Sequence, residues 1–308
     1  MTASPIPSYR LSCADPDVHR QLSNWLDGTR LVWPGEFTLR VTVGDVSPFA
    51  PDSRESFPQA DVGIQAGAPL DTVRLTWHDV SAEAEIHPSL PEADLWLSPR
   101  AVVNLPHGER SFLLVLLVFL MRRLGWYHVH GATLIDRQQR GWLIAGNSNC
   151  GKSTTTALMA RNGWTVSTDD MAFVTRRGDR VVAMGVHSHI ALRPGGQALL
   201  GAVNGIPLEA RNKQGFWPEE LGASWTPEVT PRIIAFPAIG ERTSMTRARP
   251  RYALSNVIKW SHWVLYEPVF ADEHLDVLGA LAAQSACYDL TLGPDLFDRP
   301  QLLEELSS

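Results

Sequence analysis

Residues 146–153 read Gly-Asn-Ser-Asn-Cys-Gly-Lys-Ser, inside the longer stretch Gly141–Asp170. This octapeptide matches the phosphate-binding pattern G-x-x-x-x-G-K-[ST] at every fixed position. The apolar run Trp142–Ala145 before it predicts a buried strand. The breaker-free run Ser153–Asn162 after it, followed by Gly163, predicts a helix. A strand, a glycine-containing loop and a helix in this order predict that backbone N–H groups and the helix N-terminus hold phosphate oxygens.

The residue types in this loop indicate a nucleotide triphosphate and a divalent cation. In such loops the lysine, here Lys152, reaches the β- and γ-phosphates, and the hydroxyl of the next residue, Ser153, ligates magnesium. We therefore expect ATP and Mg²⁺ as cofactors. The expected nucleotide-binding residues are Gly146, Asn147, Ser148, Asn149, Cys150, Gly151, Lys152, Ser153 and Thr154.

Composition narrows the classes of protein. The chain has 308 residues, 44% of them hydrophobic, which suits two modest domains or one large one. A formal net charge of -6 argues against nucleic-acid or anionic membrane partners. The apolar run Phe112–Met121 is too short to span a bilayer and predicts a buried helix. With no signal-peptide pattern at Met1–Arg10 and three widely separated cysteines (Cys13, Cys150 and Cys287), we expect a cytoplasmic protein.

The sequence predicts two regions of different character. Residues 1–110 contain strand-like segments and no catalytic constellation, so we expect a β-rich N-terminal region of unknown role. Residues 111–308 contain the phosphate-loop pattern and form the expected nucleotide-binding domain. The strands expected in the first region are Phe37–Val43, Val73–Trp77 and Ala93–Leu97.

Two further features should lie near the phosphate loop. The strand Tyr127–Ile135 is expected to form a hairpin with the strand before the loop, which would bring His130 close to it. The apolar strand that begins at Thr165 should end in Asp169 and Asp170, at the carboxyl ends of the strands, where ligands bind and where Lys152 and Ser153 are expected. Purely structural roles remain open for these residues, because a histidine at a strand end is often structural and paired aspartates often cap a turn.

The rest of the chain alternates strands, helices and breaks. We expect a break at Pro194–Gly196, a loop or lid over 202–231, and an arginine-containing turn over Gly240–Arg251, whose arginines are either phosphate ligands or solvated. The expected helices are Ser111–Leu124, His274–Gln284 and Gln301–Leu306, and the expected strands are Arg180–Met184, His189–Arg193, Ile233–Phe236 and Ala286–Leu292.

The combination of His130-Gly131, the phosphate loop and Asp169-Asp170 resembles the kinase domain of HPr kinase/phosphorylase over about residues 125–200. That family phosphorylates a serine on a protein of the sugar transport system, and its nucleotide core is similar to that of phosphoenolpyruvate carboxykinase. The resemblance implies an α/β fold with a P-loop core of this type, preceded here by the β-rich region. It also implies that Asp169 is the base, that Asp170 serves the metal, that His130 assists the base, and that Lys152 takes part in catalysis.

Several positions depart from the family pattern. The family has glutamate where this chain has Thr154, and its metal-linked glutamate falls on Ala191, although Arg193 matches the signature arginine. Because that signature is associated with phosphorolysis, its loss argues against reverse activity and against HPr as the substrate. Divergent relatives of this kind include kinases that act on precursor peptides of ribosomal natural products such as lasso peptides.

Three functions therefore remain open from the sequence. The first is an ATP-dependent kinase for a serine of a protein or peptide, including a natural-product precursor peptide. The second is a small-molecule kinase on the same core, and the third is a nucleotide-binding regulatory module without transfer activity. The sequence leaves the oligomeric state open, a homo-oligomer included.

Overall fold

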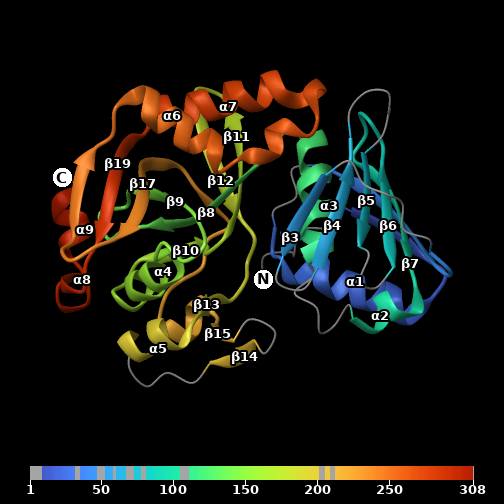
Figure 1. Cartoon of the computed structure of the whole chain (residues 1–308), viewed down its shortest axis with the longest axis horizontal. Coiled ribbons are helices and arrows are strands. Elements are labelled where there is room, and N and C mark those ends of the chain that lie inside the picture. The colour runs from blue at the N-terminus through green and yellow to red at the C-terminus, as the bar shows by residue number, and fades with distance from the viewer. Residues whose placement is uncertain are drawn as a thin grey trace, which may run out of the picture. The chain divides into compact units, whose positions relative to one another are not determined.

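The computed structural model of the 308-residue chain describes residues 9–31, 35–46, 53–57, 60–66, 73–77, 81–104, 111–200, 205–208 and 212–307. Residues 1–8, which belong to the stretch that showed no signal-peptide pattern, lie outside the described residues. The chain divides into two compact units (Figure 1), Met1–Trp126 with Tyr266–Val269, and Tyr127–Leu265 with Phe270–Ser308. None of the helices in the described ranges combines the length and apolar character that a membrane-spanning segment needs.

The first unit is built on a seven-stranded mixed sheet of order β1-β2-β7-β6-β5-β4-β3. β2 pairs in parallel with β1 and β7, and the other pairs are antiparallel. Strands were expected over 37–43, 73–77 and 93–97, and they are present. The elements are β1 (Tyr9–Cys13), α1 (Pro16–Gly28), β2 (Phe37–Val43), β3 (Ser53–Phe57), β4 (Ala60–Gln65), β5 (Val73–Trp77), β6 (Ala82–Ile86), β7 (Glu92–Leu97), α2 (Pro99–Asn104) and α3 (Ser111–Arg123).

The helix α1 was not predicted, although its start has a clear local cause. Asp15 accepts hydrogen bonds from the backbone N–H groups of Asp17 (2.9 Å) and Val18 (3.1 Å), and Pro16 occupies the first turn. The buried side of the helix carries Val18, Leu22, Trp25 and Leu26.

The second unit is built on a nine-stranded mixed sheet of order β16-β12-β11-β8-β9-β17-β19-β18, with β10 also paired to β8. Its first elements are β8 (Tyr127–Ile135), β9 (Gly141–Ala145), α4 (Lys152–Arg161), β10 (Thr165–Thr168), β11 (Met171–Arg177), β12 (Arg180–Gly185), β13 (Ile190–Leu192), α5 (Pro194–Leu200), β14 (Ile206–Leu208), β15 (Lys213–Phe216), the 3₁₀ helix η2 (Pro218–Leu221) and β16 (Glu228–Val229). They are followed by β17 (Pro231–Ile239), β18 (Ser244–Arg247), α6 (Pro250–Lys259), η3 (His262–Leu265), α7 (Ala271–Gln284), β19 (Ala286–Leu292), α8 (Asp295–Asp298) and α9 (Leu302–Leu306). The short η4 (Pro268–Phe270), between η3 and α7, spans the division between the two units.

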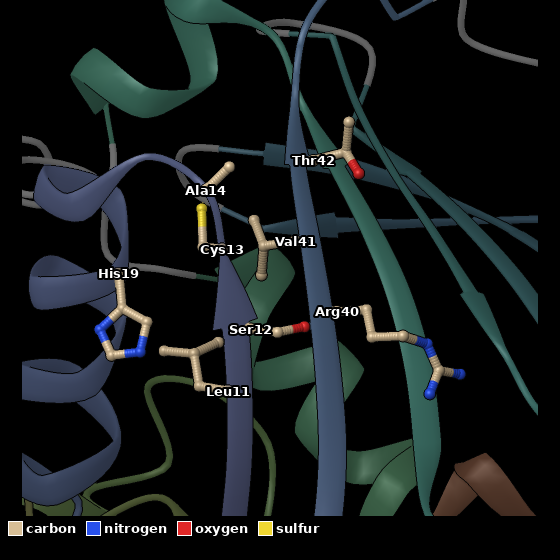
Figure 2. Close-up of a pocket in the computed structure, with 8 residues that line it drawn as sticks. All are labelled: Leu11, Ser12, Cys13, Ala14, His19, Arg40, Val41 and Thr42. Atoms are coloured by element: carbon tan, nitrogen blue, oxygen red, sulfur yellow. The ribbon is translucent and has the colours of Figure 1, made fainter.

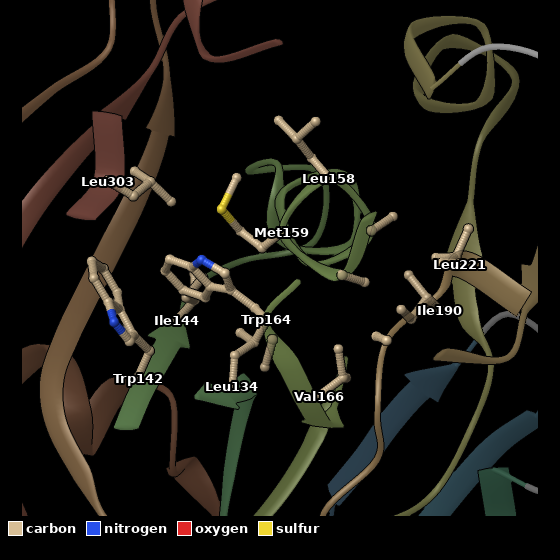
Figure 3. Packing of buried hydrophobic residues seen from close by; sticks show 14 of the residues in the cluster. Leu134, Trp142, Ile144, Leu158, Met159, Trp164, Val166, Ile190, Leu221 and Leu303 are labelled. Carbon is tan, nitrogen blue, oxygen red and sulfur yellow. The ribbon is translucent and has the colours of Figure 1, made fainter. Parts of the chain in front are cut away.

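Alternation along the central strands divides the core of this unit into two layers. On one face Trp142 and Ile144 of β9 pack with Met159 of α4 and with Trp164 (Figure 3), and the rings of the two tryptophans are 5.1 Å apart. On the other face Leu143 and its neighbours pack with residues of α6 and α7. A strand that is apolar at every position is expected when both faces of its sheet are covered.

Three expectations for the second half of this unit were wrong. Pro194–Gly196 was expected to break the chain, but Pro194 begins α5, where its fixed φ suits a first helical turn. The expected loop over 202–231 contains β14, β15, η2 and β16, and β15 joins β13 and β14 in a three-stranded sheet. The expected turn Gly240–Arg251 contains β18 and the start of α6. Phe216, the last residue of β15, anchors that strand because its side chain is buried in the core beside α4.

Candidate functional site

The loop between β9 and α4 has the backbone geometry of an anion-binding turn. Asn149 (φ 66°) and Gly151 (φ 98°) adopt the left-handed conformation. The positive φ favours glycine at 151, and a Cβ there would also lie 2.7 Å from Cδ1 of Leu292 and 3.0 Å from Cδ1 of Ile239. The loop is therefore held closely against the ends of β17 and β19.

The first turn of α4 presents unused backbone donors to this loop. The first helical hydrogen bond runs from Thr155 N–H to the Gly151 carbonyl (2.9 Å), so the N–H groups of Lys152, Ser153 and Thr154 precede it. Gly151 provides no side-chain cap. Such an uncapped N-terminus attracts an anion through its N–H groups and through the helix dipole.

Lys152 places a cation inside the loop. Its Nζ donates hydrogen bonds to the carbonyl oxygens of Gly146 (2.7 Å) and Asn147 (2.9 Å), and the residue is 6% exposed. An ammonium group has three protons, so one remains for a ligand after these two bonds. Asn147, Ser148 and Asn149 are exposed, and Cys150 is a half-buried free thiol.

Strand register brings the two aspartates to the level of the loop. Gly131 of β8 lies opposite Ala145, the last residue of β9, and on its other side its N–H donates to the Asp170 carbonyl (3.0 Å). A Cβ on Gly131 would lie 2.9 Å from the Ile144 carbonyl oxygen, so this position needs glycine. The loop and the aspartate pair therefore flank β8 at the same height.

As expected, a strand ends at the two aspartates, because β10 ends at Thr168 and Asp169 follows it. β10 and β11 both pair with β8, with Thr168 opposite Thr133 and Met171 opposite His130. Asp169 and Asp170 lie between β10 and β11 and interrupt the pairing of the chain with β8. The step turns the two carboxylates into different surroundings.

Asp169 is buried, with 4% of its surface exposed, and only partly satisfied. Its Oδ2 accepts a hydrogen bond from the Ala191 N–H (3.4 Å), whereas Oδ1 has no hydrogen-bond partner among the described residues. Burial, and then the charge of Asp170, raise the pKa of Asp169 to about 6, against the opposing influence of Ser153, Ala191 and Lys152. The result is a carboxyl group that takes up and releases a proton near neutral pH.

Asp170 has the opposite electrostatic character. Its Oδ1 is 2.8 Å from Nε2 of His130, and its side chain is 63% exposed. Desolvation raises the pKa of Asp170, but the hydrogen bond and charge of His130, with Lys152, outweigh it and hold this pKa below the ordinary carboxyl value. The resemblance implied that His130 assists Asp169, whereas the carboxylate it contacts is Asp170.

His130 and His128 differ although both lie on β8. The backbone N–H of His130 donates to the Trp260 carbonyl (2.7 Å), and its ring meets the Trp260 ring edge-on at 6.4 Å. His128 is buried against Phe173, and burial, followed by the charge of His130, lowers the pKa of His128 to about 3. His128 is therefore a neutral core residue, and only His130 belongs to the site.

The donor set fits a magnesium ion completed by a nucleotide. Within the described ranges, no group of three or more His, Cys, Asp or Glu residues could hold a metal. Magnesium usually takes one or two protein oxygens and completes its shell with phosphate oxygens and water. Ser153 and Asp170 supply such oxygens, and the unpartnered Oδ1 of Asp169 is a third candidate.

Sequence reasoning missed some residues that shape the site. The Ala191 N–H, from β13, is 22 residues away from the carboxylate it contacts, and no local pattern indicated this. Ile239 and Leu292 close the other side of the loop from the ends of β17 and β19. The only available signal for them was that ligands bind at strand ends.

The first unit contains a separate surface hollow of about 480 Å³, lined by residues of β1, α1 and β2 (Figure 2). Cys13, His19 and Arg40 are the chemically distinctive residues there. The Arg40 guanidinium contacts Asp94 (2.8 Å) and Glu92 (3.0 Å), so its charge is already paired.

Comparison with known proteins gives distant structural likenesses and no match in sequence. No protein family and no curated protein matches the sequence. Among solved structures, the chain is similar to the Hpr(Ser) kinase/phosphatase from Coxiella burnetii, with 10% sequence identity and a TM-score of 0.30. The match covers 58% of this chain and 92% of that one. Because a TM-score of this size cannot carry a functional argument, any function assigned to this mixed α/β protein rests on the site itself.

Proposed function

We propose that this chain is an ATP-dependent phosphotransferase that moves the γ-phosphate to a serine hydroxyl of a protein or peptide. One observation carries the proposal: a buried carboxyl group with an unpartnered oxygen and a pKa of about 6 lies level with a lysine-containing phosphate loop. Phosphoryl transfer needs this combination of a cationic cradle and a positioned proton acceptor.

The loop provides the binding half of the reaction. The N–H groups at the start of α4 and the Lys152 ammonium bind the β- and γ-phosphates. Ser153 and Asp170 hold a magnesium ion, which when bound neutralises phosphate charge. His130 donates to Asp170 and keeps that carboxylate ionised and oriented for this role.

Asp169 provides the proton-transfer half. Its Oδ1 accepts the proton of the serine hydroxyl as the hydroxyl oxygen attacks the γ-phosphorus and the bond to the β-phosphate oxygen breaks. A base with a pKa near the working pH is both ionised and basic enough for this step. Burial and the charge of Asp170 together give Asp169 that proton affinity.

Ser153, an expected magnesium ligand, also acts on the pKa of Asp169. This supports a second assignment, in which Asp169 serves the metal and the Asp170–His130 pair is the base. In the first assignment Asp170→Asn loses magnesium–nucleotide binding, and in the second assignment Asp169→Asn does.

The experiment that tests the proposal uses γ-labelled ATP, magnesium and a cell extract, with Lys152→Ala as the control protein. A labelled protein or peptide band that contains phosphoserine supports the proposal. A labelled metabolite would instead indicate a small-molecule kinase. Label in neither fraction, with ATP still bound, would indicate a nucleotide-binding module without transfer activity. The methyl side chain of Ala191, where the resembling family has a metal-linked glutamate, favours that module as the second candidate.

A further inference from the structure

The ends of β17 and β19 carry an exposed apolar residue directly beside the phosphate loop. Ile239, the last residue of β17, is 66% exposed, whereas Leu292, opposite it on β19, is buried. Its Cδ1 lies 3.0 Å from where a Cβ on Gly151 would stand. Ile239 therefore offers apolar surface to a ligand held in the neighbouring loop.

This residue is rigidly placed. Just after it, the N–H of Gly240 donates to the Leu292 carbonyl (3.0 Å). Three residues further on, the N–H and the hydroxyl of Thr243 both donate to Oδ1 of Asp295, each at 2.8 Å. The turn between β17 and β18 is thus fastened to the chain after β19. Arg242 lies in this fastened turn and is exposed.

Strand order decides which part of a nucleotide meets Ile239. β9, which leads into the loop, has β8 on one side and β17 on the other, and β19 lies beyond β17 (Figure 1). Asp169 and Asp170 flank β8, so the acceptor hydroxyl meets the γ-phosphate on that side. In phosphoryl transfer the attacking and leaving oxygens are roughly in line across the phosphorus. The leaving diphosphate and its nucleoside therefore extend toward β17 and β19.

We infer that Ile239, with Arg242 beside it, forms the nucleobase subsite of this protein. The inference rests on the proposed function, because it needs the γ-phosphate to face the aspartates. Ile239 packs against one face of the base, and the Arg242 guanidinium is available to stack on the base or to contact the α-phosphate. The subsite recognises a flat, partly apolar ring, so it distinguishes a nucleotide from a bare polyphosphate.

Calorimetric titration tests this inference with two probes, a non-hydrolysable ATP analogue and inorganic tripolyphosphate, each with magnesium. The parent should bind both probes and bind the ATP analogue more tightly. Ile239→Ser should weaken binding of the ATP analogue about tenfold, or about 1.4 kcal/mol, and should weaken tripolyphosphate binding much less. Ile239→Val should retain most of the ATP affinity. Leu265→Ser removes an isoleucine-sized side chain that is 80% exposed in η3 and should change neither affinity.

The outcomes separate this inference from the proposed function. If Ile239→Ser binds the ATP analogue like the parent, or loses both probes equally, the nucleobase subsite is wrong while phosphate binding stands. If the parent prefers tripolyphosphate to the ATP analogue, the subsite is wrong as well. If the folded parent binds neither probe, the phosphate-loop function itself fails.

Discussion

Replacement of Asp169 by asparagine should stabilise the folded protein at neutral pH and destroy its transfer activity. The carboxyl group is 4% exposed and its pKa is raised from 3.8 to about 6, chiefly by burial. A group whose pKa is higher in the folded state favours folding when protonated, and that contribution disappears as pH rises through the folded-state value. Above pH 6, the parent therefore keeps a buried charge that asparagine does not carry.

The magnitude follows from the shift. A difference of about 2 pKa units, at about 1.4 kcal/mol per unit, amounts to about 3 kcal/mol between the protonated and ionised folded forms. About 2 kcal/mol of this is lost between pH 4.5 and 7.5. Asp169→Asn should thus gain about 2 kcal/mol of unfolding free energy relative to the parent over that interval.

The measurement is urea unfolding, followed by circular dichroism, of parent and variant at several pH values from 4.5 to 7.5. Subtracting the two curves removes groups common to both proteins, such as His128, whose lowered pKa makes stability fall as pH decreases from 6.5. Asp179→Asn, at an exposed turn between β11 and β12, controls for the loss of one negative charge. A stability difference that stays constant with pH would refute the raised pKa, and with it the reason to assign Asp169 as the base.

Four further variants or conditions test the site. Lys152→Ala should abolish nucleotide turnover while the circular dichroism spectrum is retained, and a normal rate would refute the phosphate-loop assignment. Ser153→Ala should raise the magnesium concentration needed for half-maximal activity; unchanged metal dependence would mean that its hydroxyl is not a ligand. Asp169→Asn should lower the transfer rate by roughly 10²–10⁴-fold with little change in nucleotide affinity. Asp170→Asn should instead weaken binding of the magnesium–nucleotide complex, as measured by calorimetry. Reversed results would exchange the roles of the two aspartates. Gly131→Ala should lower the free energy of unfolding in urea by about 1–3 kcal/mol, because the added Cβ would lie 2.9 Å from the Ile144 carbonyl oxygen. An unchanged free energy of unfolding would contradict the close packing of β8 against β9.

Local pattern predicted the elements around the phosphate loop well. The strands Tyr127–Ile135 and Ala286–Leu292 begin and end where the sequence indicated, and the helix after the loop differs by one residue at each end. Alternation, apolar runs and glycine positions are properties of neighbouring residues, so they can be recognised without the fold. The segment 205–216 was missed for the opposite reason, since its strands are held by a buried Phe216 and by pairing with β13.

The sequence by itself indicated the candidate residues of the site: the glycine loop, Lys152, Ser153, and the carboxylates Asp169 and Asp170. Only the tertiary structure decided how those carboxylates differ. His130 contacts Asp170 because Met171 lies opposite it on β8, and Asp169 receives the N–H of Ala191 from β13, 22 residues along the chain. Proton affinity depends on burial and on charges brought together from distant segments, and neither can be read from a local pattern.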